Sequence, residues 1–148
     1  MSLDFSALYT SLYARAATDS AGATLRALLG GASSLFRRTL LAANSDPNNP
    51  SRPALPWLVW SPGEVVGESG ARRDVGCSWW LYVDPDAASS EATAHSITAA
   101  VDALYGHTAR YSITGARTYV SFIGPIRPDA TLGGLLGREI RITLTQRG

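Results

Sequence analysis

Residues 74–106 read DVGCSWWLYVDPDAASSEATAHSITAAVDALYG and contain the two clearest patterns in the chain. The first half is typical of a β-strand, because apolar and other side chains alternate and so fall on opposite faces of a sheet. The apolar face comprises Val75, Cys77, Trp79, Leu81 and Val83, and the other face carries Asp74, Ser78, Trp80 and Tyr82. Two consecutive tryptophans place a large ring on each face, so we expect both faces to contact protein.

The second half predicts an amphipathic helix that ends at Gly106. Asp84 is the expected N-cap and Pro85 the expected first helical residue. The apolar stripe comprises Ala94, Ile97, Val101, Leu104 and Tyr105, and the polar stripe comprises Glu91, His95, Thr98 and Asp102. A half-buried strand followed by such a helix predicts a two-layer α+β arrangement, in which the apolar stripe packs on the apolar face of the strand.

On the N-terminal side of this stretch, helical spacing predicts helices over residues 5–16 and 20–29. Residues 34–41 predict a strand, although their weak periodicity also allows a helix. The remaining segments are a long Pro- and Asn-rich loop at 44–56, a short apolar strand at 57–60, and a glycine-rich hairpin or flap at 61–74. Long loops in small domains are usually functional or held by a partner.

On the C-terminal side, residues 110–123 predict a long strand that is broken or bulged near Gly115. Residues 124–137 predict an extended loop or irregular hairpin. Residues 138–146 alternate clearly, with Ile140, Ile142 and Leu144 expected inward and Glu139, Arg141, Thr143 and Thr145 expected outward. The whole chain, residues 1–148, therefore predicts one α+β domain with a mixed, mainly antiparallel β-sheet and helices packed on one face.

The composition bounds the partners that this chain can have. A length of 148 residues is enough to bury a core without a disulfide or metal. The net charge is +1, which is too balanced for a protein whose main task is to bind phosphates, and all 13 basic residues are arginine. Cys77 is alone and is expected to be a buried small hydrophobe. The N-terminus lacks a signal-peptide pattern, and no apolar stretch approaches the roughly 20 residues that span a bilayer.

No motif predicts catalysis, so we expect no enzyme activity, no cofactor and no metal site. A phosphate-binding loop needs a lysine, which this chain lacks. Glu91 and His95 lie four residues apart on one helical face, but two ligands do not make a metal site, so a solvated pair is expected. No serine lies in a G-x-S-x-G turn. The aromatic residues near Trp79 lack basic neighbours, which favours core packing over nucleic-acid binding.

The order of the predicted elements and the residue patterns within them resemble those of the tail-terminator, or tail-completion, proteins of long-tailed bacteriophages. The resemblance lies mainly in residues 53–84, the helix up to Tyr105, and residues 138–145. It implies a subunit that forms a ring, with six members expected, on the head-proximal end of the tail tube. Such a ring stops tube polymerisation and binds the neck proteins, while DNA passes through its centre. It also implies a location in the virion tail after assembly in the host cytoplasm.

A ring needs two different patches on each subunit, because its contacts run head to tail. The expected patches are the flap at 62–74 and the loop at 124–137, whose charged residues would pair between copies. The candidate interface residues are Arg72, Arg73, Glu64, Glu68, Arg127 and Asp129. The alternatives are a neck or head-completion adaptor of the same virion, a small cytosolic enzyme, and a module that binds single-stranded nucleic acid.

Overall fold

The computed structural model describes residues 5–69, 72–106, 112–113 and 116–147, with the backbone alone for 64–69, 72–73, 112–113 and 146–147. Its centre is the predicted strand, β3 (Arg72–Val83), which pairs antiparallel with β2 (Trp57–Ser69) on one side and with β7 (Leu135–Arg147) on the other. The short strand expected at 57–60 is therefore the start of a 13-residue strand. The expected flap is the outer half of a long β2–β3 hairpin.

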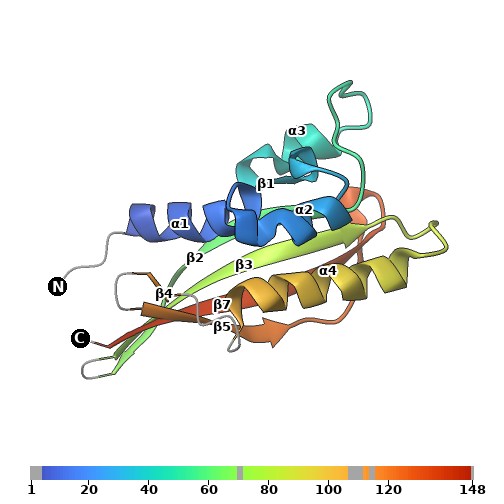
Figure 1. Cartoon of the computed structure of the whole chain (residues 1–148). Coiled ribbons are helices and arrows are strands. Elements are labelled where there is room, and N and C mark those ends of the chain that lie inside the picture. The colour runs from blue at the N-terminus through green and yellow to red at the C-terminus, as the bar shows by residue number, and fades with distance from the viewer. Residues whose placement is uncertain (1–4, 70–71, 107–111, 114–115, 148) are drawn as a thin grey trace.

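Four more strands complete a mixed, mainly antiparallel sheet (Figure 1). β1 (Leu35–Arg37) pairs parallel with β2, and β5 (Ala116–Ile123) pairs antiparallel with β7. β4 (Ser112–Ile113) pairs with the first residues of β5, and β6 (Arg127–Asp129) pairs with the start of β7. The order across the sheet is β1-β2-β3-β7-β5-β4.

The strand expected at 34–41 is wrong beyond Arg37. After three residues the chain turns into a 3-10 turn, η3 (Arg38–Leu40), and a short helix, α3 (Leu41–Ser45). The parallel pairing with β2 covers only residues 35–37, so the backbone beyond them has no strand to bond and closes its own hydrogen bonds in turns.

Helices α1 (Phe5–Ala17), α2 (Ala23–Leu28) and α4 (Ser90–Tyr105) cover one face of the sheet (Figure 1). The predicted packing of the central helix is confirmed, because the apolar stripe of α4 lies in one buried cluster with the apolar face of β3. The shared members are Cys77, Trp79, Leu81, Val83, Ala94, Ile97, Val101, Leu104 and Tyr105. Val75 departs from the prediction and packs instead with Leu8, Ala116 and Leu144, under the first turns of α1.

The predicted start of α4 is wrong. The Asp84 carboxylate accepts a hydrogen bond from the backbone N–H of Asp86 at 2.9 Å, so Asp84 and Pro85 form a turn and the helix begins at Ser90. The Ser90 hydroxyl donates to the carbonyls of Ala87, at 2.8 Å, and of Asp84, which ties the turn to the helix. The signals that predict an N-cap are the same as those of this turn.

Thr98 belongs to the expected polar stripe but is buried. Its hydroxyl donates to the Ala94 carbonyl at 2.7 Å and accepts from Arg138 Nη1 at 3.1 Å. Its two hydrogen bonds offset the cost of burying the hydroxyl. Thr143, which was also expected outward, is likewise buried, and its hydroxyl donates to Ser121 Oγ at 2.8 Å.

A second, smaller apolar cluster lies on the opposite face of the sheet and confirms that both faces of β3 contact protein. It comprises Phe36, Trp57, Val59, Tyr82 and Leu135, with the half-buried Trp80, Leu41, Leu55 and Leu132 against it. Leu41 begins α3, and Leu132 ends the 3-10 turn η4 (Ala130–Leu132). These two short elements therefore cover one end of a face that is otherwise without helices.

Cys77 is buried as predicted, and its burial raises the pKa of the thiol. Within the described ranges, no helix has both the length and the apolar character needed to cross a bilayer.

Replacement of Ile97 by Asp is expected to unfold the subunit, because Ile97 is fully buried and the new carboxylate would have no partner. The cost is on the order of several kcal/mol, which is a large part of a domain's stability. Thermal unfolding followed by circular dichroism measures it. Ala99→Asp on the exposed face of the same helix is the control. If Ile97→Asp melts at the wild-type temperature, the assigned packing of α4 is wrong.

Candidate oligomer interface

The six candidate interface residues fall into two groups at opposite ends of the sheet. Along β7, the partner of Asp129 is Leu135 and the partner of Arg72 is Arg147. Twelve strand residues of roughly 3.3 Å each separate these positions by about 40 Å. The structure therefore brings Arg127 and Asp129 together on β6 but leaves the hairpin residues at the far end.

The hairpin already aligns opposite charges within one subunit. The β2–β3 register places Glu68 across from Arg73. The side chains of Glu64, Glu68, Arg72 and Arg73 lie outside the described part of the structure, so their role between subunits remains a prediction.

At the other end, Asp129 has a local structural task that the sequence did not reveal. Its carboxylate accepts hydrogen bonds from Thr131 N at 3.0 Å and Thr131 Oγ1 at 2.6 Å, and so caps η4. The turn closes through Gly133, whose φ of 68° favours glycine. Arg127 is exposed beside it.

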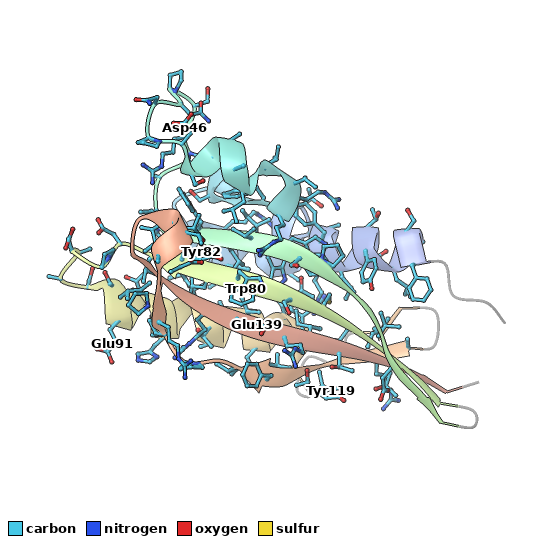
Figure 2. The ribbon with its side chains drawn as sticks, turned by 180° about the vertical axis from the view of Figure 1, so that it is seen from behind. Asp46, Trp80, Tyr82, Glu91, Tyr119 and Glu139 are labelled. Carbon is cyan, nitrogen blue, oxygen red and sulfur yellow. The ribbon has the colours of Figure 1, made fainter. Side chains whose placement is uncertain are left out.

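A cavity of about 440 Å³ lies between this turn and the sheet, on the face without long helices. Five of its eleven lining residues carry rings: Trp80, Tyr82 and Phe122 from the sheet, with Pro125 and Pro128 from the chain around β6. The rim carries the charged residues Arg127, Asp129 and Glu139. Figure 2 shows Trp80, Tyr82 and Glu139 along this face.

The polar side chains on this open face satisfy one another. Ser78 Oγ donates to Glu139 Oε2 at 2.6 Å, and Arg141 Nη2 pairs with Glu139 Oε1 at 3.2 Å. The Arg141 guanidinium also lies 5.1 Å from the centre of the Phe122 ring. Glu139 thus holds a hydroxyl and an arginine in place, and the arginine covers part of an exposed ring.

Tyr82, on the wall of the cavity, has a shifted pKa. Burial raises the pKa of its hydroxyl, and the carboxylate of Asp129 raises it further. The nearby Arg38 guanidinium has the opposite effect. The phenol is therefore neutral at physiological pH.

One edge of the sheet is formed by β5 and exposes two large apolar side chains. β4 pairs only with Ala116 and Arg117 in the part of the chain that the structure describes. At the other end of β5, Phe122 and Ile123 are 43% and 46% exposed. A bulge at Ser121 interrupts the register there, which makes this end unsuited to pairing with another strand. This end of β5 can therefore bind another surface through the side chains of Phe122 and Ile123 rather than through its backbone.

The polar stripe of α4 runs beside this β5 edge. Arg138 joins the two, because its Nε donates to the Gly124 carbonyl at 3.0 Å while its Nη1 donates to Thr98. Glu91, His95 and Asp102 continue the stripe and are exposed. His95 Nε2 lies 3.6 Å from Glu91 Oε1, and both side chains are solvated, as predicted.

The opposite edge of the sheet is rich in arginine. Here Leu40, two residues after Arg38, is 51% exposed. The Arg37 guanidinium lies 4.3 Å from the centre of the Tyr13 ring, and that of Arg52 lies 5.2 Å from the Trp57 ring. The arginines thus reach over both faces of the sheet, because Tyr13 belongs to the helical layer and Trp57 to the second cluster.

The Pro- and Asn-rich loop beside this edge is stabilised from within. Asp46 Oδ1 accepts from Asn48 N at 2.9 Å, and Asn49 Oδ1 accepts from Ser51 N at 2.9 Å. The Asn49 side-chain amide donates to the Ala43 carbonyl at 2.9 Å. These hydrogen bonds stabilise the turns of the loop.

The described residues contain no group of three or more His, Cys, Asp or Glu side chains arranged to hold a metal ion. No protein-family model matches the chain, and no curated protein is similar to it in sequence.

Replacement of Arg138 by Met removes the donors that link β5 to α4 while keeping most of the side-chain stem. We expect the free energy of unfolding to fall by about 1–2 kcal/mol, because the Gly124 carbonyl and the Thr98 hydroxyl lose a charged partner. Urea unfolding measures the loss. Arg138→Lys, which keeps one charged donor, is expected to lie between wild type and the Met variant. A Met variant as stable as wild type would contradict the structural role of Arg138.

Proposed function

We propose that this protein is the subunit of a closed ring, with six copies expected, that caps the head-proximal end of a bacteriophage tail tube. The ring stops tube polymerisation, binds the neck of the virion and lets DNA pass through its centre. The resemblance of the sequence to tail terminators motivates the proposal. The α+β fold with a mainly antiparallel sheet and a helical layer is the fold that this resemblance implies.

The observation that supports the proposal is that the two ends of the sheet differ from each other, and so do its two edges. The β2–β3 hairpin runs past the ends of α2 and α4 at one end, and the β6–η4 turn with its ring-lined cavity occupies the other (Figure 1). The two edges of the sheet also differ, one being rich in arginine and the other carrying Phe122 and Ile123. Unlike surfaces support heterologous contacts, which close into rings, and two unlike ends support two different axial partners.

Two measurements together test this function: the mass of the purified assembly and the length of the tail tubes that form in its presence. Native mass spectrometry and negative-stain images of the purified protein are expected to show a ring with six times the 15.7 kDa mass of the subunit. Added to polymerising tail-tube protein of the same virion, the ring is expected to shorten the tubes and to appear at one end. A monomer at high concentration that leaves tubes free to overgrow would refute the proposal. A ring that binds only the neck proteins would identify a neck adaptor instead.

Reversing the charge of both Arg72 and Arg73 to Glu is expected to give a soluble, folded protein that no longer caps tubes. Charged groups at an interface fix orientation and exclude wrong contacts, so reversal turns attraction into repulsion. The mass of the variant reports which contact the hairpin makes. Monomers would mean that the hairpin joins subunits, and intact rings would mean that it meets the tube.

The control is Asp19→Arg, a charge reversal at an exposed residue whose side chain makes no capping bond. It is expected to cap tubes as the wild-type protein does. Unaltered capping by the Arg72 and Arg73 double variant would remove the hairpin from the functional surface.

A further inference from the structure

We propose that the arginine-rich β1 edge of one copy docks on the β5 edge of the next copy, and that this contact joins the ring. The inference rests on the proposed ring and names the surfaces that form it. The β1 edge comprises Arg37, Arg38, Leu40 and Arg52, and the β5 edge comprises Phe122, Ile123, Glu91, His95 and Asp102.

The first argument is the placement of apolar surface. Within the described ranges, four large apolar side chains are notably exposed, and three of them lie at the two sheet edges. Leu40 follows β1, the outermost strand on one side, whereas Phe122 and Ile123 end β5 on the other side. The fourth, Leu28, ends α2 within the helical layer. Burial of such side chains against each other is the main favourable term in association.

The second argument is charge. Residues 35–52, from β1 through the loop after α3, carry three arginines and one aspartate. Residues 84–106, which form the turn before α4 and α4 itself, carry four carboxylates and neither arginine nor lysine. Complementary potentials on two patches steer copies into one orientation and oppose the contact of like edges.

Two arginines near the β5 edge are engaged within the subunit, whereas Arg117 is exposed at the other end of β5 and Arg127 is exposed on β6. Arg138 is bound to the Gly124 carbonyl and to Thr98, and Arg141 is paired with Glu139. Arg37, Arg38 and Arg52 at the other edge instead lie on aromatic rings or near the Tyr82 hydroxyl. No carboxylate pairs with these three arginines in the part of the chain that the structure describes. The ring contacts hold Arg37 and Arg52 in place without neutralising their charge.

The edges are unlike, so each copy uses one of them toward each neighbour, as a heterologous ring requires. In a ring whose axis runs along the strands, this contact sets the copies side by side with similar strand directions. The hairpin ends then gather on one face of the ring and the β6 ends on the other. The tube would meet one face and the neck the other.

Two single substitutions test the contact, each placing a carboxylate at one edge only. Leu40→Glu and Ile123→Glu are each expected to abolish the ring and to raise the dissociation constant between subunits on the order of 30-fold or more, as loss of a central apolar contact does. Leu28→Glu is the matched control at an exposed leucine outside both edges, and it is expected to form wild-type rings. Circular dichroism checks folding, and Leu40→Ser and Ile123→Ser replace either variant that fails to fold.

A mixture of the two variants gives the sharper result. Leu40→Glu keeps an intact β5 edge and Ile123→Glu keeps an intact β1 edge, so together they are expected to form a dimer of one copy each and nothing larger. Native mass spectrometry resolves this species.

Wild-type rings that persist in both single variants would overturn the edge contact while leaving the ring itself standing. Rings that break on Arg72 and Arg73 reversal but not at the edges would assign the contact to the hairpin instead. A monomeric wild-type protein would refute the ring, and with it the proposed function.

Discussion

The fold depends on one buried chain of polar contacts inside an apolar layer. Trp79 Nε1 donates to the Tyr105 hydroxyl at 3.3 Å, and that hydroxyl donates to the Leu12 carbonyl at 2.6 Å. The three residues belong to β3, α4 and α1, so one hydroxyl links the sheet to two helices. Trp79 also packs at 4.8 Å from Trp60 and at 5.7 Å from Tyr13, measured between ring centres. Because an unmade bond is costly in such surroundings, this link fixes how the helices sit on the sheet.

The sequence predicts well wherever side-chain burial determines structure. The alternation around Trp79 and the stripe around Ile97 identify β3, α4 and their contact, because each pattern follows directly from the face that is buried. Prediction fails where pairing with a neighbouring strand determines whether a segment is a strand and where it ends. The outer half of β2 has little apolar alternation and is a strand because β3 lies beside it. β1 ends where its pairing with β2 ends, which no local pattern marks.

The candidate interface residues also could not be placed relative to one another from the sequence alone. Charge and glycine content select Arg72, Arg73, Arg127 and Asp129, but spacing in the sequence cannot show that β7 separates them into two ends. The cap that Asp129 makes with Thr131 also requires a turn that only the structure defines. The edges were missed for a related reason: Leu40 and Ile123 look like core residues in sequence, and only the strand order places them at the margins of the sheet. Ile123 ends an edge strand and Leu40 lies three residues beyond the end of another, so neither position can be recognised before the strand order is known.

The position of β7 has a kinetic consequence. It follows all the other strands in sequence yet lies between β3 and β5. Its pairing with β3 extends along the whole strand, from the Val83–Leu136 pair at one end to the Arg72–Arg147 pair at the other. Closing such long loops is slow, because the chain loses conformational entropy before the favourable contacts between the strands form. Until β7 arrives, β3 and β5 are both unpaired on the sides that will face it, and the apolar rows that they share with it are bare. The folding chain therefore passes through a stage prone to aggregation, which favours rapid capture of β7 or assistance by a chaperone.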